Sequence, residues 1–325
     1  MTDNIMTTQN RRRFASFNIS RAGKANLVFA LGILALIVAT SLMSDAFLTE
    51  RNMTNVARQM VTTGLLSIGM LVVILSGGID LSVGSVVAFA GLLAAGLQET
   101  MPIGAAIAIA LSVGVAVGII NGVFVAYFRL QPFIVTLATM GAVRGALYIY
   151  SETPTYASDP FFISVLGSGK LFGVVPYTFL IFLVCIPIMW MYLNHTKSGR
   201  SVIAIGMNPE AVRLAGVDVR VQTTVAYVIC GFFAALAGVL LSARLGISQP
   251  NVGVGYELDA IAAVVIGGGV LGGGGGTVGG MFGGVLALAV IDNVLNLFNV
   301  QSYYQQLVKG VIILIAVIVR RKPQG

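Results

Sequence analysis

Charged side chains are scarce in this sequence. Only 10% of its 325 residues are Asp, Glu, Lys or Arg, against about 25% in soluble domains, while 57% are hydrophobic. The mean hydropathy is +0.94. Long apolar runs with so few charges cross bilayers as helices, because helices satisfy their own backbone hydrogen bonds. The composition therefore excludes a soluble fold and predicts an all-α integral membrane protein.

Histidine and cysteine are almost absent. The single histidine is His195, and the two cysteines, Cys185 and Cys230, lie within apolar segments. A catalytic or metal centre needs clustered ligands or paired acids and bases, so we predict no enzyme, no metal site and no disulfide. A phosphate-binding loop is also missing, since Ser164 stands where the first glycine of the motif before Lys170 is required. If the protein uses ATP, another subunit must bind it.

Apolar segments of about 20 residues, the length needed to cross the hydrocarbon layer, recur along the chain. We predict about ten transmembrane helices, with broken or re-entrant segments among them. The predicted spans are Asn26–Met43, Met60–Ser76, Leu81–Leu97, Ile103–Phe128, Pro132–Tyr150, Val174–Leu193, Val225–Ala243, Leu258–Leu271, Thr277–Phe298 and Tyr304–Val319.

Basic residues predict the orientation, because cytoplasmic loops carry an excess of Lys and Arg. An even number of spans places both termini on one side. That side collects 13 of the 19 basic residues: Arg11, Arg12, Arg13, Arg21, Lys24, Arg129, Lys197, Arg200, Arg213, Arg220, Arg320, Arg321 and Lys322. We therefore expect both termini in the cytoplasm, and the net charge of +7 requires no nucleic-acid partner.

The predicted domain organisation is simple. Residues 1–24 form a basic cytoplasmic segment, residues 25–320 a single transmembrane domain, and residues 321–325 a cytoplasmic tail. The N-terminal apolar run is too long for a secretory signal, so we expect a retained first span. A cytoplasmic loop at about residues 194–221 interrupts the apolar segments.

That loop contains a string with the signals of one short helix, GMNPEAVRLAGVDV (Gly206–Val219). Asn208 is suited to cap the helix start, Pro209 to be its first residue, Glu210 to complement the helix dipole, and Gly216 to end it. The i, i+3, i+4 spacing of three apolar residues predicts a docking face for a soluble partner; the alternative is an ordinary solvated connector. The candidate partner-binding residues are Asn208, Pro209, Glu210, Ala211, Val212, Arg213, Leu214, Ala215 and Gly216.

Two strings interrupt the apolar segments. SGGIDLSVGS (Ser76–Ser85) places Asp80 and Ser82 where they can cap the third span beside a cavity, or form a tight cytoplasmic turn. A second string, Gly255–Gly276, ends in eight glycines among ten residues. So many glycines cannot hold an isolated helix, so this segment either packs backbone to backbone or forms a re-entrant or cytoplasmic loop.

Polar residues inside predicted spans supply further candidates. Arg144, Asp292 and Lys309 are too costly to face lipid, so each must be paired or line a path. Arg144 has no acidic residue in spans four to six, so we expect its partner on another segment, as a carboxylate or as backbone carbonyls. Candidates for the translocation path, or alternatively for hydrogen bonds that hold the bundle together, are Asp80, Ser82, Asn121, Arg144, Asp292, Asn293 and Asn296.

Glycines at four-residue spacing predict close helix contacts. Gly114, Gly118 and Gly122 form one such row in the fourth span. Two shorter rows, Gly279 with Gly283 and Gly280 with Gly284, lie in the ninth span.

The strings SGGIDLSVGS, GMNPEAVRLAGVDV and GYELDAIAAVVIGG together resemble permease subunits of bacterial ATP-binding cassette (ABC) importers for monosaccharides, the ribose, xylose, galactose, arabinose and allose group. A fourth string, SYYQQLVKGVIILIAV (Ser302–Val317), follows in the same order, so the resemblance extends from about residue 52 to the C-terminus. The chain departs from the family at Gly269, Val270 and Gly275, where relatives often carry polar residues.

The resemblance implies an ABC importer permease in the bacterial inner membrane. Its implied partners are a second copy of the chain, a cytoplasmic ATPase that binds ATP and magnesium, and a periplasmic sugar-binding protein; this chain binds no cofactor itself. Asn208 to Gly216 resembles the segment that docks on the ATPase. The implied function is import of a pentose or aldohexose, such as ribose or allose, by alternating access. An ion-coupled secondary transporter, an ABC permease for a related furanoid compound and a structural membrane scaffold remain alternatives.

Overall fold

A computed structural model describes the chain from residue 21 to residue 320. The predicted tails, residues 1–24 and 321–325, therefore lie outside the described residues except for residues 21–24. The helices are α1 (Arg21–Met43), α2 (Glu50–Leu75), α3 (Val83–Gly96), α4 (Ile103–Ala126), α5 (Pro132–Tyr150), α6 (Tyr177–His195), α7 (Lys197–Met207), α8 (Pro209–Leu214), α9 (Val219–Leu245), α10 (Tyr256–Ile266), α11 (Val278–Leu297) and α12 (Ser302–Arg320).

The remaining regular structure is minor. A 3₁₀ turn, η1 (Leu97–Glu99), follows α3, and a π-helical segment, η2 (Phe161–Gly167), precedes α6. Strand β1 (Thr155–Tyr156) pairs antiparallel with β4 (Ile247–Ser248), and β2 (Lys170–Leu171) pairs antiparallel with β3 (Val175–Pro176). These two pairs of two-residue strands are the only strands among the described residues.

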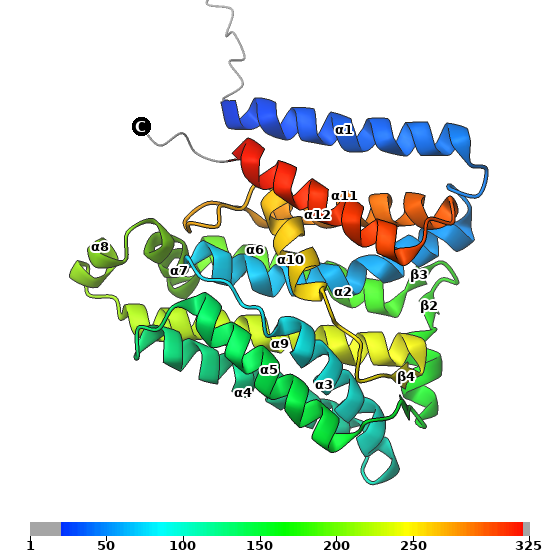
Figure 1. Ribbon diagram of the computed structural model, residues 1–325, viewed down its shortest axis with the longest axis horizontal. Helices are drawn as coiled ribbons and strands as arrows, with labels where there is room; N and C mark the ends of the chain where they lie inside the picture. The colour runs from blue at the N-terminus through cyan, green and yellow to red at the C-terminus, as the bar shows by residue number, and fades with distance from the viewer. Residues whose placement is uncertain (1–20, 321–325) are drawn as a thin grey trace, which may run out of the picture.

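The long helices lie side by side in layers, with α2 and α9 in the interior (Figure 1). Helix α9 packs against α2, α3 and α4, and nearly all of α2 beyond Met60 is buried. Helices α4, α5 and α6 instead expose apolar side chains, as expected of surfaces that meet lipid or another subunit.

Six described helices are long and apolar enough to cross a membrane: α2, α4, α5, α6, α9 and α11. The other four predicted spans correspond to α1, α3, α10 and α12. Helix α3 has 14 residues and α10 has 11, so neither can cross about 30 Å of hydrocarbon alone. The prediction of a continuous span at Leu258–Leu271 was wrong, because the helix ends at Ile266 and glycines with positive φ follow at Gly268, Gly273, Gly274 and Gly276.

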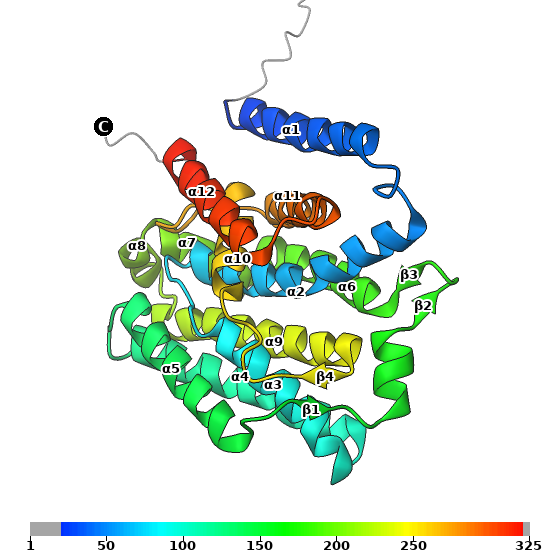
Figure 2. The same cartoon turned by 45° about the vertical axis from the view of Figure 1, so that its right-hand side comes forward.

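The two short helices begin against one another inside the bundle. A side chain on Gly84, near the start of α3, would collide with the carbonyl of Gly253, just before α10. Helix α10 then runs across the long helices instead of along them (Figures 1 and 2). Helix α3 therefore starts in the interior after the break at Ser76–Ser85, and α10 starts there at Tyr256. The glycine-rich end of the second string packs backbone to backbone, since Gly267 lies against Gly280 and Gly273 against Gly206.

Glycine rows bring helix backbones together, as the sequence predicts. Gly114, Gly118 and Gly122 on α4 leave no space for a methyl group because they lie against the backbone of α9. Gly280 and Gly284 on α11 similarly lie against the end of α10, whereas Gly279 faces open space. The expectation was thus right for the α4 row and for one of the two α11 rows.

The two ends of the bundle differ. The first residue of α1, the last of α12, and helices α7 and α8 gather at one end, while the small strands lie at the other (Figures 1 and 2). We call these the α8 end and the hairpin end. This arrangement agrees with the prediction that the two ends of the transmembrane domain and the loop at about residues 194–221 lie on one side of the membrane. The assignment of that side to the cytoplasm stays a prediction.

Candidate functional site: a capped helix, a polar cavity and a basic pocket

Helix α8 forms as its local sequence predicts. The Asn208 side chain accepts a hydrogen bond from the Ala211 amide at 3.0 Å, and Pro209 occupies the first helical position. Gly216 has φ +82°, and the amides of Gly216 and Val217 bond back to carbonyls of the helix. These are the features of a six-residue helix fixed at both ends.

The outer face of α8 is exposed and partly apolar. Leu214 is 74% exposed, Ala211 and Ala215 are exposed beside it, and Val212 is buried inward. Arg213 donates two hydrogen bonds to the Glu210 carboxylate, and those bonds lower the pKa of Glu210. The helix thus presents an apolar patch next to a charged pair, a surface suited to a protein partner.

Helix α7 was missed by sequence reasoning. Thr196 caps its start through a hydrogen bond from the Gly199 amide at 3.0 Å, and Val202 and Ile205 are buried. Its last turn touches the glycine-rich loop, because Gly206 lies against the Leu75 carbonyl and the backbone of Gly273 and Gly274. The signal was present in the capping residue and in the spacing of the two buried aliphatic residues.

Asp80, Ser82 and Asn121 come together in a buried network. Asp80 is 1% exposed and accepts hydrogen bonds from the Ser82 amide at 2.9 Å and the Ser82 hydroxyl at 2.6 Å. Asn121 donates to the Ser82 oxygen at 2.9 Å and accepts from Thr139 at 2.7 Å. The network joins the break before α3 to α4 and α5, and its internal hydrogen bonds favour the bundle-holding interpretation over a role in the translocation path.

Arg144 finds its partner on another segment, as expected. Its guanidinium donates to the carbonyls of Pro250 at 2.6 Å and Val252 at 2.9 Å, in the loop between β4 and α10. Backbone carbonyls are therefore its hydrogen-bond partners. Arg144 holds the loop that leads to the buried start of α10.

Asp292 belongs to a second cluster, centred on Lys309. The Lys309 ammonium lies 3.0 Å from Asp292 on α11 and 3.1 Å from Asp259 on α10. Asn293 instead exchanges hydrogen bonds with Asn52 at 2.7 and 2.9 Å. The structure therefore separates the seven path candidates into distinct groups that do not share one site.

A polar cavity of about 210 Å³ surrounds the Lys309 cluster, between α2, α9, α10, α11 and α12. Asn296 lines it and accepts a hydrogen bond from Gln305 at 2.9 Å. The lining residues are Gln59, Thr62, Thr63, Leu241, Arg244, Tyr256, Asp259, Asp292, Asn296, Gln305 and Lys309. Of the predicted path residues, Asp292 and Asn296 reach this cavity.

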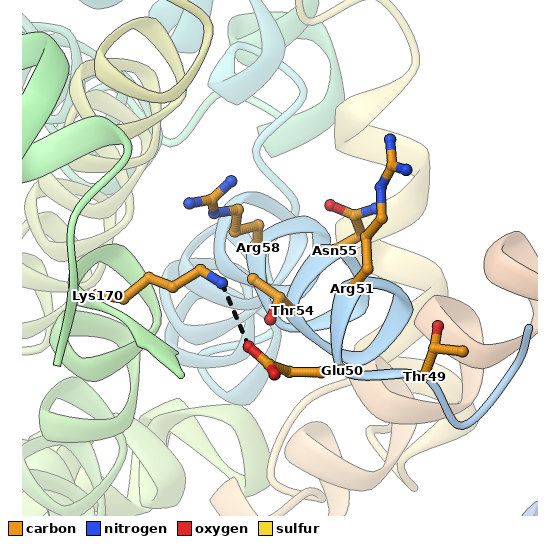
Figure 3. A pocket seen from close by; sticks show the side chains of 7 residues that line it. All are labelled: Thr49, Glu50, Arg51, Thr54, Asn55, Arg58 and Lys170. Carbon is orange, nitrogen blue, oxygen red and sulfur yellow. Dashed lines mark ion pairs between the residues drawn. The ribbon is translucent and has the colours of Figure 1, made fainter. Parts of the chain in front are cut away.

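An open basic pocket of about 560 Å³ lies at the hairpin end (Figure 3). Its lining residues are Thr49, Glu50, Arg51, Thr54, Asn55, Arg58 and Lys170. Lys170 points toward Glu50 at 3.7 Å, and Arg58 donates to the Ser168 carbonyl at 2.9 Å. Three cations and one carboxylate line the pocket, so its net positive charge suits an acidic partner.

Sequence reasoning missed most cavity and pocket residues. The available signal was on α2, where polar residues recur every four positions in two neighbouring rows. One row is Glu50, Thr54, Arg58 and Thr62, and the other is Arg51, Asn55, Gln59 and Thr63. Because the predicted span began at Met60, these rows were divided between a loop and a helix.

A bundle of apolar helices with an exposed capped helix at one end, a basic pocket at the other and a polar cavity in between defines a membrane permease subunit. Comparison with known proteins agrees. The chain belongs to the family described as the permease component of branched-chain amino acid transport systems, which matches residues 52–317.

Three characterised relatives cover nearly the whole chain. The ribose import permease protein RbsC of Escherichia coli K12 is 40% identical over an alignment of 301 residues that covers 90% of this chain and 93% of the relative. The L-arabinose transport system permease protein AraH of the same strain is 37% identical over 92% of this chain and 90% of its own length. The galactose/methyl galactoside import permease protein MglC of that strain is 33% identical over 88% and 91%. No significant match to a solved structure was found.

These matches confirm the predicted class. The chain is an inner-membrane permease subunit of an ABC importer and not an enzyme, since ATP hydrolysis in such importers belongs to a separate subunit.

Proposed function

We propose that this chain moves a monosaccharide, a pentose or an aldohexose, from the periplasm to the cytoplasm by alternating access. The observation that carries the proposal is the position of α8: a short helix capped at both ends, exposed on its outer face and packed through α7 against the core of the bundle. The names of the relatives, which import ribose, L-arabinose and galactose, supply the substrate class.

In the proposed cycle, a cytoplasmic ATPase binds ATP and magnesium and contacts α8 through Ala211, Leu214 and Ala215. A periplasmic sugar-binding protein docks at the hairpin end, where Arg51, Arg58 and Lys170 attract acidic side chains. Two copies of the permease form the translocation unit. ATP binding closes the ATPases, and the movement of α8 changes which end of the bundle is open.

The test is sugar uptake by proteoliposomes that contain the permease, its co-purified ATPase and the binding protein. Leu214→Asp should abolish sugar-dependent ATP hydrolysis and weaken ATPase association at least about 30-fold, because loss of an interface hot spot costs about 2 kcal/mol or more. Membrane insertion should not change, since Leu214 is exposed in the isolated subunit.

Leu214→Met is the matched control, because it keeps an apolar side chain of similar size and should retain coupling. Normal coupled turnover in the Asp variant would remove α8 from the mechanism. Uptake that runs on a proton or sodium gradient without the ATPase would establish the ion-coupled alternative. An absence of any solute flux would favour a structural scaffold.

A further inference from the structure

The two polar rows on α2 form a continuous track from the basic pocket to the polar cavity. Residues 50 to 63 span about 20 Å at 1.5 Å per residue, and both rows lie on adjacent stripes of the helix. From Gly64 to Leu75 the only polar side chain is Ser67, which bonds back to the Thr63 carbonyl at 2.6 Å. The track therefore begins at the hairpin end and stops at the cavity.

The charges that line the cavity balance. Among the described residues of the lining, Asp259 and Asp292 contribute two carboxylates and Lys309 and Arg244 two cations, so their formal charges sum to zero. A neutral lining that is dense in polar groups favours a neutral polar solute over an ion, because no net charge attracts a counter-ion.

Several groups in the cavity have unfilled hydrogen-bonding capacity. The side chains of Thr62, Gln59 and Arg244 line the cavity and make no hydrogen bond within the described residues, so their polar atoms can bond to a solute. Oδ1 of Asp292 is buried without a hydrogen bond in the described chain. A buried unbonded carboxylate oxygen is costly, and together with the three unbonded side chains of the lining it indicates a ligand that supplies hydrogen-bond partners.

Size and surface narrow the class of ligand. A volume of about 210 Å³ is below the range of about 300 to 1,000 Å³ typical of drug-sized ligands, so the cavity suits a small solute. Of the described residues in its lining, only Leu241 and Tyr256 are mainly apolar. A branched-chain amino acid would lack an apolar pocket for its side chain here, whereas a sugar can bond to the polar groups and place its C–H face on the tyrosine ring.

We infer that this cavity is a monosaccharide site within the permease, reached along the polar track of α2, with Gln59, Thr62 and Arg244 as hydrogen-bond donors to the sugar. The inference rests on the proposed function and adds a specific resting point for the solute. The Lys309 cluster fixes α10, α11 and α12 around the site and supplies carboxylate acceptors.

Thr62→Val provides a direct test in the full importer complex. Valine has the shape of threonine, and the lost hydroxyl has no partner in the described protein, so a purely structural role predicts no loss of stability. A sugar-contacting role predicts that the rate of sugar uptake falls about fivefold, the equivalent of one lost hydrogen bond of about 1 kcal/mol.

Thr178→Val is the matched control. Thr178 on α6 is also buried with an unbonded hydroxyl, but it does not line the cavity. The probes are D-ribose, L-arabinose and D-galactose, with L-leucine as a competitor. A second measurement uses a Thr62→Cys variant in which Cys185 and Cys230 are replaced by alanine. It compares the rate at which the new thiol reacts with a small thiol reagent in the presence and absence of sugar.

The outcomes are distinct. Slower uptake in Thr62→Val but not in Thr178→Val, together with protection of the Thr62→Cys thiol by the transported sugar, supports the site. Equal uptake in both valine variants, or a thiol whose reaction rate sugar leaves unchanged, overturns it even though the importer works. If the wild-type complex takes up none of the three sugars, the proposed function itself fails. Inhibition of uptake by L-leucine would contradict the polar character assigned to the cavity.

Discussion

Replacing Lys309 with methionine should destabilise the protein strongly. Lys309 lies on α12 and bridges Asp259 on α10 and Asp292 on α11 at 3.1 and 3.0 Å, and its side chain is only 20% exposed. Methionine keeps the length of the apolar stem but removes the charge. Two carboxylates of adjacent helices then face each other in the interior without a cation between them.

The expected magnitude follows from the burial of the cluster. Breaking a buried ion pair by removing one partner costs about 3 to 5 kcal/mol, because the remaining charge is left uncompensated. An unfolding entropy of about 2.1 cal/mol/K per residue gives a shift of about 1.5 °C per kcal/mol for a chain of this length, so the midpoint of thermal unfolding should fall by roughly 4 to 8 °C. Lys309→Arg keeps the positive charge, so its unfolding midpoint should fall much less than that of Lys309→Met.

The measurement is thermal unfolding of detergent-purified protein, followed by the loss of its monodisperse chromatographic peak. Lys170→Met is the matched control. Lys170 also pairs with a carboxylate, but at 3.7 Å, with side chains 30% and 66% exposed, so its removal should cost no more than about 1 kcal/mol.

A triple variant tests the reason for the effect. Lys309→Met combined with Asp259→Asn and Asp292→Asn leaves no uncompensated charge, so it should recover most of the lost stability. An unchanged midpoint in Lys309→Met would show that the cluster is solvated and contributes little. A triple variant as unstable as the single one would refute the electrostatic explanation and point to packing of the lysine stem.

Two further predictions concern the α8 end. Gly206→Ala should lower stability by about 1 to 3 kcal/mol and impair coupling, because the added methyl group collides with the Leu75 carbonyl, whereas Gly104→Ala, which meets open space, should be neutral or stabilising in an unfolding assay. Because hydrogen bonds from Arg213 lower the pKa of Glu210, the stability that this pair gives α8 is complete above the ordinary value of 4.5 and is lost as pH falls through the lowered value. An NMR titration should therefore place the Glu210 midpoint below 4.5 and return it to the ordinary value in Arg213→Gln; a wild-type midpoint at or above 4.5 would contradict the pairing.

Features that depend on residues close together in the sequence were predictable, whereas contacts between residues far apart in the sequence were not. The caps of α8 were predictable because Asn208, Pro209 and Gly216 act on backbone groups within a few residues of themselves. The glycine row of α4 was predictable for a similar reason, since a four-residue period marks a helix face whatever its partner.

The polar clusters depend on which helices become neighbours, and one sequence does not give that. Asn121 bonds to residues about 40 positions earlier in the chain, and Asn293 bonds to Asn52, 241 positions away. Both were candidates for the translocation path or for hydrogen bonds that hold the bundle together, but their partners follow only from the packing of the bundle. The polar track on α2 was a different case, because its four-residue period is visible in the sequence once the helix is taken to begin at Glu50.

The contact between Gly206, Leu75 and the Gly273–Gly274 turn brings three backbones together with no side chain between them. The amide of Gly274 also donates to the Leu75 carbonyl at 3.0 Å. No side chain in this contact can rotate to absorb a displacement of α7. A movement of α7 and α8 should therefore be transmitted directly to the end of α2 and to the turn that precedes α11.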